Sequence, residues 1–178
     1  MSAEADSEKT PPRKYNEAKL AGLYEEYYDR IARYAHIHIG HRAEAEDIAG
    51  EVFLKALESL GSYQERGIPM QAWLFRIAHN MVVDHLRKRE KRRTVSIDTL
   101  QIESGKDPAT IAEKNLELER VSKAMEQITA AQRNVVGLRF FGGLTSKEVG
   151  QVLNKSDGAV REMQRAAIET LRRLLITE

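Results

Sequence analysis

Two arginines four residues apart, Arg161 and Arg165, have the chemistry and spacing of a DNA-binding helix. They lie on the polar side of a helix predicted over residues 156–175. The opposite side carries an apolar stripe at spacings of three and four residues: Val160, Met163, Ala167, Leu171 and Leu174. A guanidinium can hydrogen-bond a guanine edge or a phosphate, and the carboxylate of Glu162 can accept a hydrogen bond from a cytosine amine. These residue types indicate a helix that binds nucleic acid with one face and packs against a core with the other.

The residues before this helix predict a short partner helix. Thr145 and Glu148 have the spacing of a capping box, which marks a helix start, and Thr129 and Gln132 have the same spacing upstream. Asn154 can take the left-handed conformation that ends a helix, and Ser156 can cap the next one. A short capped helix, a turn and a longer arginine-bearing helix are typical of helix-turn-helix domains. A plain helical hairpin with solvated arginines has the same local pattern, so the rest of the chain must decide.

A second candidate nucleic-acid surface lies on a helix predicted over residues 70–87. One arc of it combines aromatic, amide, acidic and basic side chains: Trp73, Arg76, Asn80, Asp84 and Arg87. The arc runs into residues 87–93, of which six of the seven are basic. Because the net charge is only +1, any binding of DNA must come from such a local cluster of basic residues. Trp73 itself is expected to have a structural role, since most tryptophans are largely buried.

The helix predicted over residues 42–60 carries charge of the opposite sign. Its polar face is almost entirely acidic: Glu44, Asp47, Glu51, Lys55 and Glu58. This spacing alone is compatible with an ordinary solvated face. It indicates a binding surface only if other features of the chain supply a partner.

The remaining pattern predicts an all-α protein of two small helical domains. Helical periodicity also marks residues 15–39 and 118–141, and no strand pattern stands out. Residues 94–114 lose the periodicity and gather Ser, Thr, Gly and Pro, which predicts an irregular interdomain linker. The predicted organisation is a disordered tail (1–14), a first domain (15–93), the linker (94–114) and a second domain (115–178).

Composition limits the functions that the chain can have. Its 178 residues contain no cysteine, which excludes a disulfide framework and thiolate chemistry and fits an intracellular, cytoplasmic setting. No apolar run is long enough to span a bilayer, so we expect no membrane insertion. No Ser/His/Asp constellation or phosphate-binding glycine loop is present. We therefore expect no enzyme activity and no cofactor.

A metal site is the remaining chemical alternative. It is suggested by His36, His38 and His41, with Glu44 and Asp47 nearby. On a helix His38 and His41 would be neighbours, but His36 would point elsewhere. We therefore predict surface or semi-buried histidines at a helix end and no metal.

Over residues 16–175, the order of these parts resembles the RNA polymerase sigma factors of the extracytoplasmic-function (ECF) type. Residues 45–57 (AEDIAGEVFLKAL) resemble the family's region-two helix, which docks on the clamp coiled coil of the largest polymerase subunit. Residues 71–93 (QAWLFRIAHNMVVDHLRKREKRR) resemble the helix that reads and melts the promoter −10 element. Residues 128–175 resemble region four, which reads the −35 element.

The resemblance implies a role for individual residues. Polymerase docking would involve Asp47, Glu51 and Phe53. Loop residues 62–67 would hold a flipped-out −10 base and include Ser62, Tyr63 and Gln64. Further −10 contacts would come from Arg76, Asn80, Asp84, Arg87 and Lys88. The −35 contacts in the major groove would come from Ser156, Gly158, Arg161, Glu162 and Arg165.

The resemblance also implies a function and partners. An alternative bacterial sigma factor would bind core RNA polymerase, through its clamp coiled coil and flap, and direct it to specific promoter DNA. Many members of the family are held by an anti-sigma factor, and no residue here identifies one. The sequence departs from the family at Gly50, where glutamine is frequent, and at residues 162–164, where a more basic run is common. The −35 DNA sequence that other members of the family read therefore cannot be assigned to this protein.

The competing prediction is a stand-alone helix-turn-helix transcriptional regulator. It explains residues 144–175. It gives no function to residues 71–93 or to the acidic helix, and it predicts no binding to core polymerase.

Overall fold

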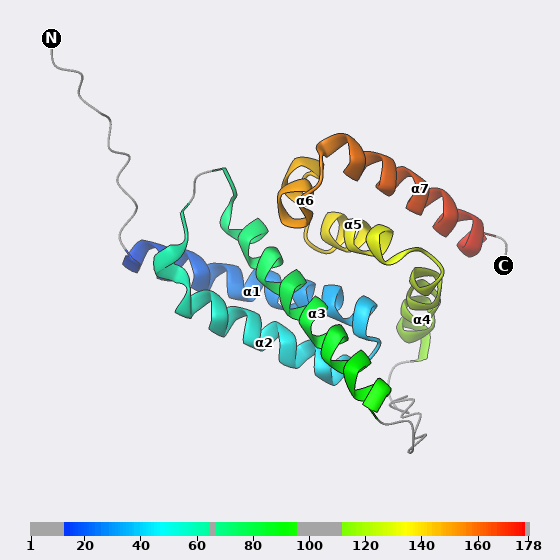
Figure 1. Ribbon diagram of the computed structural model, residues 1–178, viewed down its shortest axis with the longest axis horizontal. Helices are drawn as coiled ribbons and strands as arrows, with labels where there is room; N and C mark the ends of the chain where they lie inside the picture. The colour runs from blue at the N-terminus through cyan, green and yellow to red at the C-terminus, as the bar shows by residue number, and fades with distance from the viewer. Residues whose placement is uncertain (1–12, 65–66, 96–111, 177–178) are drawn as a thin grey trace, which may run out of the picture.

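The computed structural model of the chain describes residues 13–64, 67–95 and 112–176. Its elements are α1 (Arg13–Ile39), α2 (Arg42–Glu58), the 3-10 helix η1 (Leu60–Ser62), α3 (Met70–Val95), α4 (Ala112–Glu126), α5 (Ala130–Phe140), α6 (Ser146–Leu153) and α7 (Asp157–Ile176). Helices α1–α3 form the N-terminal half and α4–α7 the C-terminal half (Figure 1). The predicted all-α class is confirmed.

Several helices are longer than predicted. Helix α1 begins at Arg13, within the expected tail, and α4 begins at Ala112, within the expected linker. Helix α3 continues past the predicted end at residue 87 as far as Val95, because no Gly or Pro interrupts it and Lys, Arg and Glu are good helix formers. The rest of the predicted tail (1–12) and of the predicted linker (96–111) lies outside the described residues.

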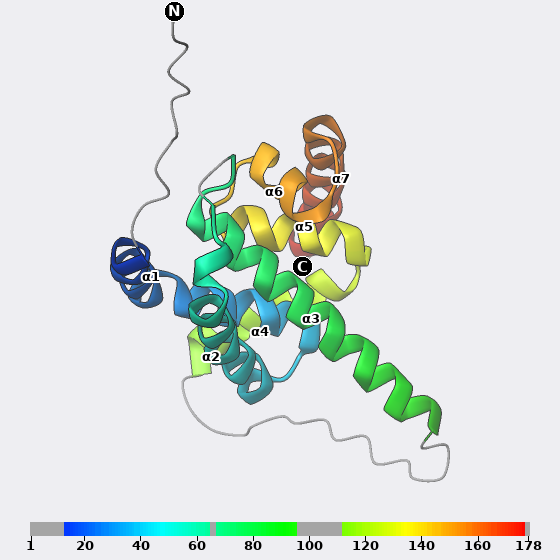
Figure 2. The same ribbon diagram turned by 60° about the vertical axis from the view of Figure 1, so that its left-hand side comes forward.

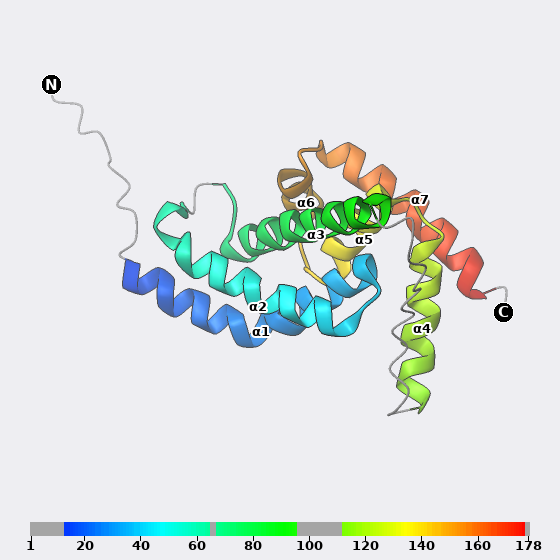
Figure 3. The ribbon, with the colours of Figure 1, turned by 60° about the horizontal axis from the view of Figure 1, so that its bottom comes forward.

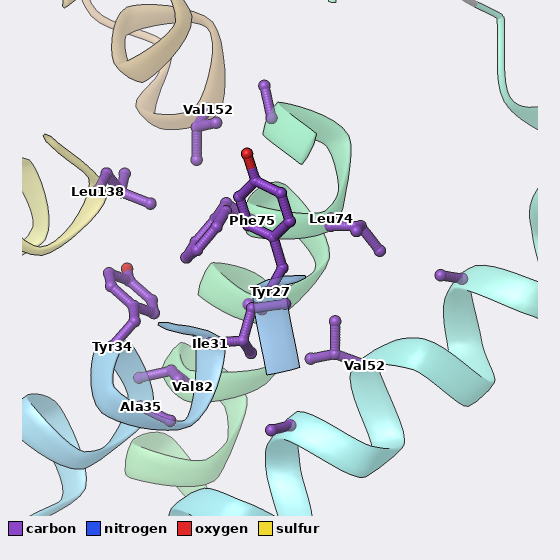
Figure 4. Close-up of a cluster of buried hydrophobic side chains, with 14 of the residues drawn as sticks. Tyr27, Ile31, Tyr34, Ala35, Val52, Leu74, Phe75, Val82, Leu138 and Val152 are labelled. Carbon is purple, nitrogen blue, oxygen red and sulfur yellow. The ribbon is translucent and has the colours of Figure 1, made fainter. Parts of the chain in front are cut away.

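Helices α1–α3 pack around aromatic side chains. Phe75 of α3 meets Tyr27 and Tyr34 of α1 edge to face, with ring centroids 6.1 and 5.9 Å apart. Figure 4 shows these rings with Ile31 and Val52. The buried side of α3 is broad. It comprises Met70, Ala72, Leu74, Phe75, Ala78 and Val82, because α3 packs against α1, α2 and α6 at once.

The predicted helix signals in the C-terminal half are confirmed. Capping boxes form at Thr129 and at Thr145, whose side chain accepts a hydrogen bond from the Glu148 N–H at 3.2 Å. Asn154 ends α6 in the left-handed conformation, with φ 54° and ψ 51°. The Ser156 hydroxyl accepts a hydrogen bond from the Ala159 N–H at 3.1 Å and so caps α7.

The two halves share one hydrophobic core. Leu138 of α5 and Val152 of α6 belong to the same buried cluster as Tyr34 and Phe75, and Figure 4 shows them side by side. Helix α5 lies on α1 and α6 lies on the start of α3, as Figures 2 and 3 show. A smaller cluster of Met125, Ile128, Val136 and Ala167 joins α4, α5 and α7.

A polar chain runs through the shared core. The Tyr34 hydroxyl lies 2.8 Å from Nδ1 of His79, and the Tyr34 carbonyl accepts a hydrogen bond from His38 at 2.8 Å. The other ring nitrogen of His38 lies 2.7 Å from the side-chain oxygen of Asn134 on α5. Burial lowers the pKa of His79 from 6.5 to about 4, with a further contribution from His38, and burial also lowers the pKa of His38.

These shifts predict acid sensitivity. Below pH 6.5 the unfolded chain binds a proton at His79 that the folded chain does not bind until about pH 4. Stability from this group is therefore fully present above pH 6.5 and falls as the pH drops towards about 4. We expect His79→Gln to flatten this fall in denaturant titrations between those two pH values, leaving a residual slope from His36 and His38, whose pKa values burial also lowers.

Tyr34→Phe is the matched control. It removes the hydroxyl partner of His79 and should lower the free energy of unfolding by about 1 kcal/mol at neutral pH. The slope with pH should stay, because the imidazole remains buried. An unchanged slope in His79→Gln would contradict the assignment.

Candidate polymerase and nucleic-acid interfaces

The predicted −35 residues lie together on one exposed face at the start of α7. This reading face comprises Ser156, Gly158, Arg161, Glu162 and Arg165. It borders a groove of about 850 Å³ that is lined by arginines of α5 and α7, among them Arg139 and Arg172. A Cβ added at Gly158 would have no atom within 4 Å, so another molecule can approach the backbone there. The face is exposed, borders a basic groove and is carried by a capped helix.

Arg161 is held by side chains from both helices of the motif. Its Nη2 lies 2.7 Å from a carboxylate oxygen of Asp157, and its Nε donates to the Ser146 hydroxyl at 3.4 Å. Ser146 in turn hydrogen-bonds the other carboxylate oxygen of Asp157. These contacts use one edge of the guanidinium, while the side chain remains 70% exposed. The opposite edge can therefore be presented to a base or phosphate in a fixed orientation.

Arg165 has a different environment. Its guanidinium binds Glu162 at 2.5 Å and lies 3.8 Å from Glu169. The hydrogen bond from Arg165 holds the pKa of the Glu162 carboxyl below its ordinary value. Two carboxylates thus compete with any nucleic-acid contact of Arg165. Arg161 pairs with only one described carboxylate, that of Asp157.

Arg139 was missed by the sequence analysis. From α5, its Nε donates to the Gln164 side chain at 2.8 Å and its Nη1 donates to the carbonyl of Leu144. It therefore joins α5, the start of α6 and the inner side of α7. The available signal was a single cation inside the apolar segment 135–141, which needs a partner when partly buried.

The acidic face of α2 is also partly apolar. Asp47 and Glu51 are exposed as predicted, and Leu54 and Leu57 beside them are 63% and 46% exposed. We call these four residues the docking face. Phe53, predicted with them, lies instead in the core, 7% exposed, with its ring 4.9 Å from that of Tyr24. The reason is that the apolar side of α2 packs against α1, which places Phe53 beneath this surface rather than on it.

The predicted −10 residues before α3 divide into exposed and buried members. Ser62 and Gln64 are exposed. Tyr63 is buried, with its ring 5.0 Å from Trp73 and its hydroxyl donating to the carbonyl of Ile68 at 3.3 Å. Tyr63 therefore supports the loop from inside, as Trp73 was expected to do. Residues 65 and 66 lie outside the described residues.

Along α3, most predicted −10 residues are exposed. They are Asn80, Asp84, Arg87 and Lys88, with an ion pair of 2.7 Å between Asp84 and Arg87. The basic residues up to Arg93 continue this surface. Arg76 departs from the expectation, because its Nη2 donates to the Gln151 carbonyl of α6 at 3.0 Å and the side chain is half-buried. In this structure Arg76 faces the C-terminal half.

The histidines at the end of α1 make contacts within the protein. His38 uses both ring nitrogens, and His41 caps α2 by accepting a hydrogen bond from the Glu44 N–H at 3.3 Å. Across residues 13–64, 67–95 and 112–176, no cluster of three or more His, Asp or Glu side chains has a geometry that could hold a metal ion. The same ranges contain no helix long and apolar enough to cross a bilayer.

Comparison with known proteins places both halves in one family. Residues 23–92 match Sigma-70 region 2, and residues 124–173 match Sigma-70 region 4. The chain has a fold similar to that of the sigma factor RpoE from Bartonella quintana, solved in complex with the anti-sigma factor NepR. The TM-score is 0.71 and the identity 21%, over 93% of this chain and 99% of that one.

Curated relatives agree with these matches. The ECF RNA polymerase sigma factor BldN of Streptomyces coelicolor is 33% identical over 86% of this chain, which spans 59% of the length of BldN. The ECF RNA polymerase sigma factor SigD of Mycobacterium bovis is 30% identical over 80% of this chain and 70% of SigD. The two sigma regions in order, together with these relatives, show that the chain belongs to the ECF-type RNA polymerase sigma factors.

Proposed function

We propose that this protein binds core RNA polymerase, directs it to a specific set of promoters and helps to open the −10 region. The observation that carries the proposal is that two matched sigma regions present separate exposed surfaces of different chemistry on one chain. We assign the region-two function to residues 15–93 and the region-four function to residues 115–178. The protein would act in the cytoplasm by binding alone, without catalysing a reaction.

The docking face of α2 suits a protein partner. Asp47 and Glu51 would repel DNA phosphates. Leu54 and Leu57 offer exposed apolar surface, and its removal from water on binding a protein partner is favourable. A basic and apolar partner surface would complement this mixture, and we assign that role to the clamp coiled coil of the polymerase. Phe53 would act from beneath, by fixing α2 against Tyr24.

The exposed part of α3 suits promoter DNA near the −10 element. Arg87, Lys88 and the basic residues after them can neutralise phosphates, so binding should weaken steeply as salt rises. Taking a base out of the stack costs a few kcal/mol, which a protein without ATP chemistry must recover by binding the extruded base. Ser62, Gln64 and Asn80 supply exposed polar groups for that purpose.

The reading face of α7 suits the major groove at the −35 element. Arg161 is the strongest candidate for a base contact, because Asp157 and Ser146 fix its guanidinium and leave its outer edge for a guanine. Gly158 allows the start of α7 to approach the DNA backbone. The stand-alone regulator would use this face too, but it leaves the docking face of α2 without a function.

Run-off transcription tests the function directly. Core bacterial polymerase is incubated with a library of genomic promoter fragments, with and without the protein. Specific transcripts that depend on the protein are expected, and their start sites define the −35 and −10 elements. Absence of both transcripts and core polymerase binding would instead favour the stand-alone regulator.

We expect Arg161→Ala to weaken binding to a promoter so identified by about tenfold, in line with the loss of one bidentate base contact. Arg165→Ala should weaken it less, because Glu162 and Glu169 already share its charge. Fluorescence anisotropy with promoter DNA measures both. Core polymerase affinity should be unchanged, and loss of polymerase binding with retained DNA binding would show that the two surfaces are wrongly assigned.

We expect Glu51→Lys and Leu54→Ala each to lower affinity for core polymerase by about tenfold, as for residues central to a protein interface. The matched control is Glu126→Lys, which makes the same charge change at an exposed position of α4. Surface plasmon resonance with immobilised core polymerase compares the three variants. If Glu126→Lys lowered affinity as much as Glu51→Lys, net charge rather than the docking face would account for the effect.

A further inference from the structure

The last turns of α3 carry residues 87–93, which we call the basic end of α3, and they have little apolar support. The last buried residue of the helix is Val82, and Leu86 one turn later is only partly buried against the main core. Residues 87–95 are all exposed. Figure 2 shows these turns projecting past α1 and α2. Beyond Leu86, apolar burial cannot fix the direction of the basic end.

Several side chains of the basic end make contacts within α3 itself. Arg87 pairs with Asp84 at 2.7 Å, and Arg93 lies 3.8 Å from Glu90. The Nε of Arg92 donates to a backbone carbonyl one turn earlier, at 3.4 Å. Contacts inside one helix do not set its direction relative to neighbouring helices. Other contacts must therefore do so.

Arg89 reaches a different helix. Its Nη1 donates a hydrogen bond to the carbonyl of Ile39, the last residue of α1, at 2.9 Å. The last carbonyls of a helix have no partner within that helix, and a cation is favourable at the negative end of the helix dipole. Arg89 therefore caps α1 and ties the basic end of α3 to it.

A second contact ties α3 to α2. Nε2 of His85, one turn before Arg89, lies 3.1 Å from a carboxylate oxygen of Glu44. Residues four apart lie on the same side of a helix, so both ties leave α3 in the same direction. At about 100° per residue, Arg87 lies on the opposite side from both. The ties therefore hold α3 from one side and leave its other side exposed.

Both ties end at the turn between α1 and α2, which has a well-defined geometry. Gly40 has a φ of 75°, the left-handed conformation that ends a helix, and its N–H donates to the carbonyl of His36 at 2.8 Å. His41 then caps α2 by accepting a hydrogen bond from the N–H of Glu44. Glu44 lies one turn before Asp47 of the docking face. The basic end of α3 is thus tied to the helix that carries the docking face.

We propose that Arg89 is a positioning residue for promoter opening: with the contact of His85 to Glu44, it fixes the direction of the basic end of α3 relative to the docking face of α2. This inference rests on the proposed function. When polymerase holds α2, the ties keep Arg87 and Lys88 in a set position for −10 DNA, which reduces the cost of ordering them on binding. Arg89 is itself exposed, so the competing assignment is one more phosphate ligand.

The salt dependence of DNA binding separates these two roles. Each phosphate contact contributes about 0.9 to the slope of log affinity against log salt concentration for duplex DNA. With the full chain and a fluorescent duplex pool of random sequence, Lys88→Ala should lower the magnitude of this slope by about 0.9. Arg89→Ala should leave it unchanged. A slope lowered as much by Arg89→Ala as by Lys88→Ala overturns the inference.

The direction of the basic end is measured by the distance between two nitroxide spin labels. The chain contains no cysteine, so Lys55→Cys in α2 and Glu90→Cys in α3 give unique labelling sites, both exposed. Arg89→Ala should broaden the distribution of label distances. The matched control Arg13→Ala, at the other end of α1, should leave it narrow. Equal widths for these two variants overturn the inference.

Promoter opening tests the consequence for function. Polymerase saturated with the full chain is placed on a promoter identified by run-off transcription, and permanganate reactivity of unpaired thymines reports opening. Arg89→Ala and Glu44→Ala should each lower opening by about fivefold, as for the loss of one hydrogen bond. The two variants change the net charge in opposite directions. Increased opening with Glu44→Ala would show that charge alone decides, and would overturn the inference.

Variants of different chemistry keep the test independent of folding. Arg89→Lys retains a donor and a cation, and should restore the narrow distances and most of the opening. If circular dichroism shows that Arg89→Ala is unfolded, Arg89→Met, which keeps a long stem but no donor, replaces it. If the unmodified protein directs no specific transcript, the proposed function is wrong. The label distances and salt slopes still decide between the two roles of Arg89, because they need neither polymerase nor a promoter.

Discussion

The packing around Tyr34 is the interaction on which the whole arrangement depends. Its ring lies between Phe75 of α3 and the bare backbone of Gly137 on α5, and its hydroxyl is satisfied by His79. Its carbonyl orients His38, which reaches Asn134 of the C-terminal half. A buried phenol without these partners would be costly, so one side chain couples the polar and apolar parts of the interface.

The chain separates its proposed binding surfaces by charge as well as by position. The docking face of α2 is acidic and apolar, whereas the exposed end of α3 and the groove beside α7 are basic. A surface with one sign of charge attracts its own partner and repels the partner of the oppositely charged surface. This gives specificity even where affinity is modest. The near-zero net charge of +1 is therefore the sum of opposed local surfaces, and says little about any one of them.

Local features of the fold could be predicted because they depend on neighbours in sequence. The capping boxes at Thr129 and Thr145 and the left-handed Asn154 need only residues within one turn. The burial of Phe53 and Tyr63, the inward turn of Arg76 and the bridging role of Arg139 could not be predicted. Each is decided by a partner helix distant in sequence, such as α6 for Arg76 and α7 for Arg139. Helical periodicity identifies a face but not what covers it.

Helix α6 packs against both α3 and α7. One side of it lies on α3 through Val152 and Gln151, and its first residue, Ser146, binds Asp157 at the start of α7. A Cβ at Gly150 would lie 2.5 Å from the Lys155 carbonyl oxygen, so the turn between the helices has no room for a side chain at this position. This close approach and the hydrogen bond between Ser146 and Asp157 hold α6 against α7. The proposed −10 and −35 surfaces therefore meet at α6, through the bond of Arg76 to Gln151 on one side and that of Ser146 to Asp157 on the other.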